Sequence, residues 1–304
     1  MKIRDIDIIY LSYDEPNADE NYADLLTKAP WAKRVHGVEG SDAAHKACAE
    51  LSETDRFITV DGDNKIYADF LEQEIDFNQH KYISESVLSW CGYNVVNGLM
   101  YGNGGLKCWP KDVVLNMKTH EASDPNNLAA QVEFCWNLDY VQMSSCYSKV
   151  YNNASPWQAW RAGFREGVKM SLDQGKKFNS LTFKEEVYWQ NLHRLLIWCN
   201  VGSDVENGLW AMYGARQGAY MTNLTDWDYV NVRDFKYLNN LWKTQVSKEV
   251  NEDNLMDKIN DIGNALQRDL HIAVTSVFTP TQSKQFKESY TNTDRTGQGF
   301  INVE

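Results

Sequence analysis

A strand is expected at Arg56-Phe-Ile-Thr-Val60, and it runs directly into the acidic turn Asp61-Gly62-Asp63-Asn64. Its residues are rich in β-branched and aromatic side chains, which favour a buried strand. Two carboxylates one residue apart at the end of such a strand can both reach a hard divalent cation, and Gly62 lets a phosphate come close. That cation would bridge to the phosphates of a bound nucleotide. We therefore expect Asp61 and Asp63 to be metal ligands in an enzyme that uses a nucleotide-activated donor.

Similar acidic triplets elsewhere in the chain are interpreted differently. Asp5-Ile6-Asp7 lies at the start of the first expected strand, and Asp226-Trp227-Asp228 lies among turn-forming residues. Acidic side chains are common on protein surfaces, so both triplets are expected to be solvated. A calcium-binding EF-hand loop that starts at Asp61 is excluded, because Lys65 and Ile66 occupy the positions of a ligand and of a glycine.

The composition predicts one large globular domain, or one and a half, without a membrane span. The chain has 304 residues, of which 43% are hydrophobic and 12% aromatic. No stretch is long and apolar enough to cross a bilayer, and the amino terminus lacks a long apolar secretory region. The six cysteines form no C-x-x-C pair, which favours free thiols in a cytosolic protein. The net charge of -12 speaks against a broad nucleic-acid-binding face but leaves room for a local basic groove.

Strands and helices alternate in the first part of the chain. The expected strands are Ile6–Tyr13, Ala32–Val38 and Arg56–Val60. Between them, Asn17 is expected to cap a helix, with Glu20 as its reciprocal partner, and that helix reaches about Lys28. Ser41 is expected to cap a second helix with a face of small residues. Such alternation predicts a parallel sheet with right-handed crossovers.

Three candidate site residues follow from this arrangement. In open parallel sheets, ligands bind beyond the carboxyl ends of the strands. Tyr13, His36 and Asp61 all fall at such ends. We therefore expect these residues to lie near one another and near a bound ligand.

The pattern changes to short strands and turns between Lys81 and Met117. Asn97-Gly98 and Gly102-Asn103-Gly104-Gly105 are typical turn sequences between apolar runs. The last two glycines either let a ligand lie against the backbone or form a plain hairpin. They do not form a P-loop, because no Gly-Lys-Ser/Thr follows them. A further strand is expected at Gln131–Tyr140.

A basic stripe is expected on a helix that Ser155 caps and that runs to about Asp173. Arg161, Arg165 and Lys169 recur every four residues, so they share one face of this helix. That face is either simply solvated or a contact for phosphate groups, which arginine binds well in a bidentate manner.

The remainder of the chain is also expected to be helical. Thr182 and Glu185 form a capping-box pattern for a helix that reaches Cys199. Residues 255–270 carry apolar side chains at helical spacing. The tail from Gln282 onward is polar and is expected to be mobile without a ligand.

Asp204 and Glu206 are candidate catalytic acids with a simpler alternative explanation. Ser203 and Glu206 form a capping-box pattern that would open the next helix, which contains Arg216. Asp204 would then complement the dipole of that helix.

Together these features resemble the GT-A class of glycosyltransferases. The resemblance lies in the alternating start of the chain and in Gly40-Ser-Asp-Ala-Ala-His-Lys46, which leads into Phe57-Ile-Thr-Val-Asp-Gly-Asp63. It implies an α/β fold with a Rossmann-like nucleotide-sugar-binding sheet in residues 1–120. Residues 121–304 would then form a mostly helical, acceptor-side region packed on the same core.

More narrowly, the chain is similar to GT-A-like enzymes of tailed bacteriophages, through Asn97–Lys107, Ala159–Met170 and Val201–Gly218. Some of those enzymes transfer a sugar, arabinose in one case, to 5-hydroxymethylcytosine in phage DNA. The resemblance implies a metal-dependent transferase that moves arabinose or glucose from a UDP-sugar to this base in duplex DNA. It also implies a location in the cytoplasm of the infected host cell and no membrane partner.

The resemblance also gives roles to individual residues. Asp61 and Asp63 would hold Mn²⁺ or Mg²⁺ and the diphosphate of the donor. The other candidates for donor binding are Ser12, Tyr13, Asp14, His36, Gly40, His45, Gly104, Gly105 and Arg216. His45 either faces the donor or is a hydrogen-bonded packing residue.

The acceptor side is less defined. The chain lacks an obvious Glu/Asp-Asp pair to deprotonate the acceptor, so Asp204 or Glu206 would be the base in an inverting route, and retention stays open. The candidate contacts for DNA phosphates are Arg161, Arg165, Lys169 and the Lys176-Lys177 pair. Eleven tryptophans suit stacking on sugars, so a glycan or small-molecule acceptor is the alternative. A noncatalytic nucleotide-sugar-binding module is the third hypothesis.

Overall fold

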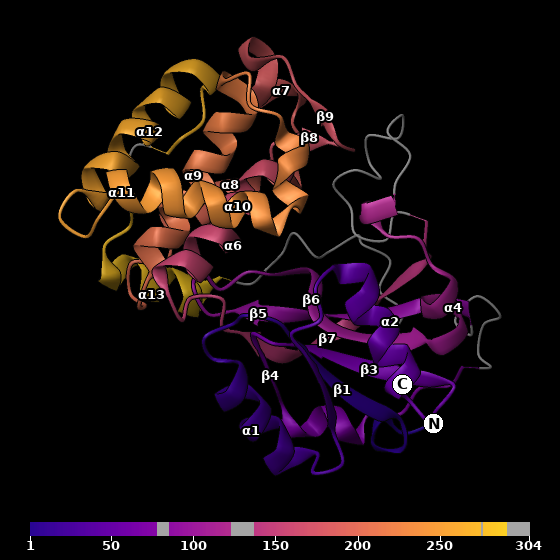
Figure 1. The fold of residues 1–304 in the computed structure, drawn as a ribbon. Coiled ribbons are helices and arrows are strands. Elements are labelled where there is room, and N and C mark those ends of the chain that lie inside the picture. The colour runs from indigo at the N-terminus through magenta and orange to yellow at the C-terminus, as the bar shows by residue number, and fades with distance from the viewer. Residues whose placement is uncertain (78–84, 123–136, 275, 291–304) are drawn as a thin grey trace.

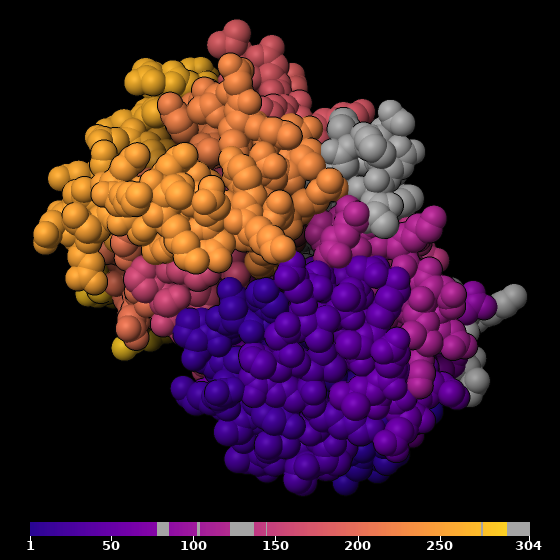
Figure 2. All heavy atoms as spheres, in the orientation of Figure 1, coloured from indigo at the N-terminus to yellow at the C-terminus, as the bar shows by residue number. Residues whose placement is uncertain are grey.

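The computed structural model describes residues 1–77, 85–122, 137–274 and 276–290, with the backbone alone at 102, 103 and 144. It has two parts that lie directly against each other (Figures 1 and 2). We call residues 1–150 the sheet part and residues 151–290 the helical part. The expectation of an α/β fold with a mostly helical second half is confirmed.

A seven-stranded mixed sheet forms the centre of the sheet part. Its strands are β1 Asp7–Ser12, β2 Lys33–His36, β3 Arg56–Asp61, β4 Asn64–Ile66, β5 Val87–Asn94, β6 Met100–Pro110 and β7 Tyr140–Val150. They lie in the order β2-β1-β3-β6-β5-β7-β4. β1 pairs in parallel with β2 and β3, which confirms the alternating start expected from the sequence. β6 is antiparallel to both β3 and β5.

Helices cover both faces of these strands. The helical segments of the sheet part are η1 Ile3–Asp5, α1 Ala18–Lys28, α2 Ser41–Leu51, η2 Ala68–Glu72, α4 Lys111–Asn116 and η3 His120–Ala122. Alternate residues of a strand face opposite sides of a sheet. Ile58 therefore packs in the core on the side of α1, and Phe57 packs in the core on the side of α2 (Figure 1). Burial on both faces explains why β3 is buried from Arg56 to Val60.

The sheet extends past the boundary expected at residue 120, because β7 lies between β5 and β4 and pairs with both. Within the strand expected at Gln131–Tyr140, residues 131–136 lie outside the described residues. Residues 137–139 belong to no strand, and β7 begins at Tyr140.

Capping in the sheet part differs from the expectation. The amide of Asn17 donates to the carbonyl of Tyr151 at 2.9 Å and does not cap α1. Glu20 forms an ion pair with a lysine of β4, so the expected reciprocal box is wrong. α2 begins at Ser41 itself and is preceded by Gly40, whose φ is +91°. The side chains of Asn17 and Glu20 thus bond to residues that are distant in sequence and not to the start of α1.

The glycine-rich stretch at residues 102–105 lies inside β6, so the turn expected there is wrong. The reason is steric, because a Cβ on Gly104 would lie 1.9 Å from the backbone nitrogen of Gly92 in β5. The two backbones therefore approach more closely than side chains permit, at a point where the register of the strands shifts. The turn between these strands lies at Asn97-Gly98, as expected, and Gly98 has a φ of +79°.

The two other acidic triplets have different surroundings. Asp226 and Asp228 are exposed, as expected. Asp7 is half-buried, accepts a hydrogen bond from the backbone nitrogen of Glu53 and pairs with Lys33 at 3.3 Å. The expectation of a solvated side chain is therefore wrong for Asp7, which has a structural role at the amino end of β1.

The helical part is built around the helix that Ser155 caps. Its hydroxyl accepts from the backbone nitrogen of Gln158 at 3.1 Å, as expected. The elements are α6 Pro156–Lys169, β8 Leu172–Asp173, β9 Lys176–Lys177, η4 Ser180–Thr182, α7 Phe183–Glu186, α8 Trp189–Asn200, α9 Gly208–Leu224, η5 Tyr229–Arg233, α10 Phe235–Leu241, the π-helical η6 Trp242–Val246, α11 Ser247–Glu249, α12 Leu255–Leu270 and α13 Pro280–Ser289. α6 thus ends before the expected Asp173, which lies in the β8–β9 hairpin.

Two capping boxes expected in the helical part are wrong. The hydroxyl of Thr182 bonds to the carboxylate of Glu186 at 2.7 Å, and the expected helix is divided into α7 and α8. The hydroxyl of Ser203 donates to the carbonyl of Phe278, and α9 begins only at Gly208. In both places a competing hydrogen bond removes the side chain from the helix end.

The polar tail expected from Gln282 begins inside a helix. Thr279 and Gln282 form the reciprocal capping box of α13, which extends to Ser289. Among the helices in the described residues, none combines the length and apolar character needed to cross a membrane.

α6 and α9 cross with their backbones in contact. A Cβ on Gly163 of α6 would lie 1.9 Å from the carbonyl oxygen of Ala211, and one on Gly214 of α9 would lie 2.2 Å from that of Trp160. A second pair of glycines repeats this contact one turn along. The close approach fixes the position of α6, which carries Arg161 and the rest of the basic stripe.

Candidate functional site

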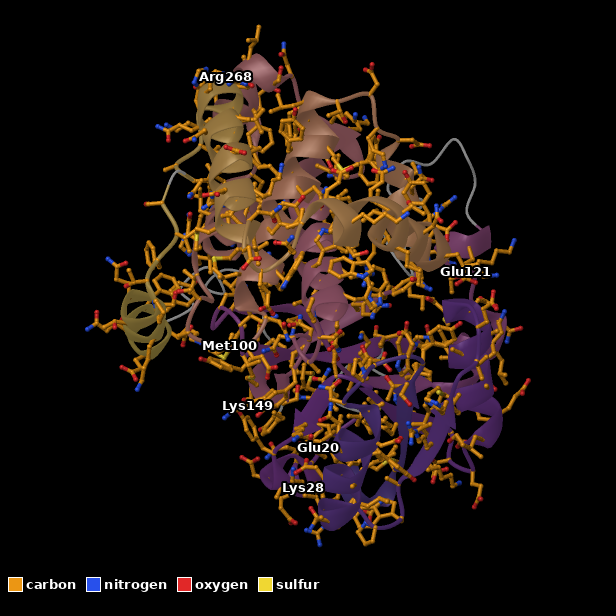
Figure 3. The ribbon with its side chains drawn as sticks, turned by 60° about the vertical axis from the view of Figure 1, so that its left-hand side comes forward. Glu20, Lys28, Met100, Glu121, Lys149 and Arg268 are labelled. Atoms are coloured by element: carbon orange, nitrogen blue, oxygen red, sulfur yellow. The ribbon has the colours of Figure 1, made fainter. Side chains whose placement is uncertain are left out.

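A cavity of about 640 Å³ lies between the two parts, at the carboxyl ends of β1 and β3. Cavities of this size suit small-molecule ligands and cofactors. From the sheet part it is lined by residues that include Tyr13, Asp14, His45, Asp61, Asp63 and Glu121. From the helical part it is lined by residues that include Trp157, Arg161, Arg165, Arg233, Phe235 and Lys236. Figure 3 shows Glu121 at the boundary between the two parts.

Three carboxylates meet on the sheet side of the cavity. Asp61 ends β3 and lies opposite Leu11 of β1, and Asp63 follows after Gly62. Glu15 reaches into the same turn, because a Cβ on Gly62 would lie 2.6 Å from its carboxylate. Burial, followed by the charges of Asp61 and Glu15, raises the pKa of Asp63 to about 7.

These carboxylates fit a hard divalent cation. Mg²⁺ is commonly held by one or two carboxylates together with substrate phosphates and water. Asp61 and Asp63 supply two carboxylates whose mutual repulsion a cation would relieve. Beside them, the Oδ1 atom of Asn64 is buried without a hydrogen-bond partner among the described residues. Within the same residues, no group of three or more His, Cys, Asp or Glu side chains could hold a metal ion alone, so a bound ligand would complete the coordination.

The turn between the two aspartates is held by buried hydrogen bonds. The carbonyl of Gly62 accepts from the phenol of Tyr10 at 2.5 Å and from the amide of Asn21 at 2.9 Å. The carbonyl of Asp63 accepts from the backbone nitrogen of Tyr151 at 2.7 Å. The turn is therefore fixed from α1, β1 and the end of β7 before any ligand binds.

The residues expected at the end of β1 do line the cavity. Ser12 hydrogen-bonds to Nδ1 of His36 at 2.9 Å, which connects the ends of β1 and β2. Tyr13 is 44% exposed at the rim. Asp14 pairs with Arg161 of α6 at 3.4 Å. His36 does not line the cavity itself, so the structure gives it a supporting position behind Ser12.

The carboxylate of Glu121 occupies the amino terminus of α2. Glu121 accepts a hydrogen bond from the backbone nitrogen of Ser41 at 2.5 Å. A Cβ on Gly40 would lie 3.2 Å from the same carboxylate. A helix amino terminus attracts anions, and here a side chain of the protein already occupies that position.

His45 is both a packing residue and a residue of the cavity wall, so the two alternatives expected from the sequence are compatible. Its Nδ1 donates to the carbonyl of Ser41 at 2.8 Å, and its ring lies edge-on to Trp109 with centroids 5.2 Å apart. Desolvation lowers the pKa of His45 to about 4. The imidazole is therefore neutral at physiological pH.

The helical wall carries basic and aromatic side chains. The guanidinium carbon of Arg161 lies 4.8 Å from the centroid of Phe235, and that of Arg165 lies 5.0 Å from it. Arg233 donates to the carbonyl of His120 at 3.0 Å. The basic stripe predicted on this helix thus faces the carboxylates of the sheet part across the cavity, at least for its first two members.

Gly104, Gly105 and Arg216 do not line the cavity. Gly105 packs behind Asp61, because a Cβ on it would lie 2.9 Å from that carboxylate. Arg216 is fully buried in the core of the helical part, where it donates to the carbonyls of Cys199 and Ile259, both at 2.9 Å. A donor-binding role for Arg216 is therefore corrected to a structural one.

Asp204 and Glu206 also lie outside the cavity. Asp204 forms an ion pair with Lys287 of α13 at 2.7 Å, and both side chains are nearly buried. Glu206 is exposed. The expected roles of these two acids in capping α9 are not realised either, because the helix begins beyond them at Gly208.

Sequence reasoning missed several residues of the site. Glu15 directly follows Asp14, so its position just beyond β1 was a usable signal. Tyr10 also gave a signal in the sequence, because a phenol within a buried strand requires a hydrogen-bond partner. No pattern in the sequence indicates that Arg233 and Phe235 line the cavity, because only tertiary packing brings them opposite β3.

Comparisons with known proteins add little to this geometry. No protein-family model matches the chain, and no curated protein matches it. Among solved structures, the crystal structure of HddC from Yersinia pseudotuberculosis is similar over 36% of this chain and 57% of that chain. The sequences are 18% identical over the match, and the TM-score is 0.20.

Proposed function

We propose that this chain is a metal-dependent glycosyltransferase of the GT-A type that uses a UDP-sugar as donor. The observation that carries this proposal is the position of Asp61 and Asp63 at the end of a parallel strand, in a cavity of suitable size. Bound Mn²⁺ or Mg²⁺ would neutralise charge on the departing diphosphate.

The sheet part would bind the donor. Ser12, Tyr13 and Asp14 would hold the nucleoside, and the exposed ring of Tyr13 suits stacking on a base. The neutral imidazole of His45 lies in the wall beside the carboxylates and would orient the sugar. Glu121 would keep the start of α2 in place.

The proposed acceptor is 5-hydroxymethylcytosine in duplex phage DNA, in the cytoplasm of the infected host cell. Support comes from the sequence segments that resemble phage enzymes and from the exposed Lys176 and Lys177, which suit contacts with phosphates. Flipping the base into the cavity would cost roughly a few kcal/mol. The acid that accepts the hydroxyl proton would be one that lines the cavity, and Glu15 and Asp234 are the candidates on its two sides.

A glycan or small-molecule acceptor is the second candidate. Trp157 and Phe235 line the helical wall, and aromatic rings suit stacking on sugar faces. A noncatalytic nucleotide-sugar-binding module would share the same pocket, and it differs in lacking turnover.

The test is incubation with UDP-arabinose or UDP-glucose, Mn²⁺ and duplex DNA that carries 5-hydroxymethylcytosine, followed by mass analysis of the nucleosides. We expect an added pentose or hexose, and none with unmodified cytosine. Donor hydrolysis without transfer to DNA would favour the second acceptor class. Binding of UDP without any turnover would favour the module and contradict the enzyme.

A further inference from the structure

The helical wall of the cavity carries a carboxamide, that of Asn239 in α10. Asn239 lines the cavity and is half-buried, and its carboxamide forms no hydrogen bond within the described residues. Two polar neighbours are engaged elsewhere. Asp234 caps α10 by accepting from the backbone nitrogen of Tyr237 at 3.0 Å. Lys236 pairs with Glu39 of the sheet part at 2.5 Å. Asn239 can therefore hydrogen-bond to a ligand without giving up a contact of the fold.

Asn239 shares a face of α10 with two other residues of the cavity wall. It follows Phe235 by four positions and Lys236 by three, so its side chain is a neighbour of both on the helix surface. The ring of Phe235 packs against the guanidinium of Arg161, with 4.8 Å between the guanidinium carbon and the ring centroid. A carboxamide has two N–H donors and one acceptor oxygen. Asn239 is thus the residue of this face that offers a ligand both a donor and an acceptor.

Opposite α10, the sheet part supplies the ring of Tyr13. This ring is exposed at the rim of the cavity and packs against no other aromatic ring among the described residues. The main chain of Tyr13 is held in place, because its nitrogen donates to the carboxylate of Glu15 at 2.8 Å. The pKa of Lys236 is raised by its hydrogen bond with Glu39 and, to a lesser degree, by the phenol of Tyr13. The phenol therefore lies near the cavity face of α10.

An open aromatic ring near a carboxamide suits the binding of a nucleobase. The ring provides a stacking surface for any base, because every base has a π-face. A carboxamide adds selectivity, because it can bond to two atoms of a base edge at once. For uracil, the carboxamide oxygen would accept from N3–H, and the carboxamide NH₂ group would donate to an adjacent carbonyl oxygen.

We infer that Asn239 binds the edge of the uracil of the donor while Tyr13 stacks on its face. This inference rests on the proposed function and deepens it, because it assigns recognition of the base to both parts of the molecule. The diphosphate would extend from the base towards Asp61 and Asp63, which line the same cavity. Binding of the donor would thus link the helical part to the sheet part.

The experiment is titration calorimetry with UDP and with inorganic pyrophosphate, both in the presence of Mn²⁺. Pyrophosphate lacks the base, so its binding reports on the phosphate and metal contacts alone. We expect Asn239→Ala and Asn239→Leu to weaken UDP binding by about 10- to 100-fold, through the loss of two hydrogen bonds, and to leave pyrophosphate binding unchanged. Alanine leaves space for the base and leucine fills that space. A loss of UDP affinity in the leucine variant alone would mean steric exclusion of the base and would contradict the inferred hydrogen bonds.

The matched control is Asn240→Leu, because Asn240 is the next residue of α10, is exposed and does not line the cavity. This variant should bind UDP like the wild type. UDP affinity that is unchanged in Asn239→Ala, or affinities for UDP and pyrophosphate that fall together, would overturn this inference alone. A wild-type protein that binds neither UDP nor pyrophosphate would remove the proposed function together with it.

Discussion

The phenolic oxygen of Tyr10 lies 2.5 Å from the carbonyl oxygen of Gly62, so a buried side chain of β1 holds the turn between Asp61 and Asp63. The phenol is fully buried, and burial raises the pKa of Tyr10 well above its ordinary value, so the phenol is not ionised at neutral pH. Tyr10 therefore acts as a neutral donor, and the position of both carboxylates depends on it.

Replacing Tyr10 with Phe should loosen this turn. The carbonyl of Gly62 would lose one of two buried donors, which costs about 1–3 kcal/mol of unfolding free energy. Mn²⁺ affinity should also fall, because the two carboxylates lose their fixed separation. Denaturant unfolding and metal titration measure the two effects. Tyr22→Phe is the control, since its phenol donates to the carbonyl of Ala32, away from the turn; an equal loss of Mn²⁺ affinity in both variants would contradict this role of Tyr10.

Replacing either aspartate of the turn with Asn should strongly slow metal-dependent transfer and leave the protein folded. Loss of a metal ligand removes several kcal/mol of charge stabilisation, which corresponds to roughly a 100- to 1000-fold slower transfer. Initial rates at saturating Mn²⁺ for Asp61→Asn and Asp63→Asn check this. The control is Asp226→Asn, because Asp226 belongs to an exposed acidic triplet of the same spacing. This variant should transfer sugar at the wild-type rate. Near-normal rates in the first two variants would place the metal elsewhere.

Much of the sheet was predictable because its signals are local and mutually consistent. The run Arg56–Val60 is buried throughout and pairs in parallel with β1, as expected of a central strand with both faces covered. Once β3 is placed, Asp61 must lie at a carboxyl end beside β1. The positions of Asp61 and Asp63 therefore followed from a few neighbouring residues, and their role as metal ligands stays a prediction.

The rest was not predictable because contacts distant in sequence decided it. Asn17 has the residue type and position of a helix cap, but its amide donates a hydrogen bond to the carbonyl of Tyr151. The hydroxyl of Ser203 likewise donates a hydrogen bond to the carbonyl of Phe278, which is distant in sequence. Phe235 reached the cavity only through the packing of the helical part, and no periodicity in its own segment indicates that.

The stability of the protein should depend on the ionisation of His45. Its pKa is about 4 in the folded protein and 6.5 in an unfolded chain. Between these values the unfolded chain binds a proton that the folded protein does not, so this contribution is fully present above pH 6.5 and is lost as the pH falls towards 4. His45→Asn retains a donor for the carbonyl of Ser41 and cannot titrate. Thermal unfolding between pH 4 and 7 should therefore show a flatter profile for the variant, and parallel profiles would mean that His45 titrates normally.

Asp204 should matter for stability and not for transfer. Its ion pair with Lys287 is nearly buried, with exposed fractions of 13% and 10%, and it fastens α13 to the loop before α9. Removing one partner of a buried pair leaves an uncompensated charge, which costs about 3–5 kcal/mol. Asp204→Asn should thus unfold at lower denaturant concentration yet transfer sugar at the wild-type rate below its transition. Glu206→Gln, an exposed neighbour, should change neither property. A variant of Asp204 that keeps its stability and loses transfer would restore this acid as a catalytic residue.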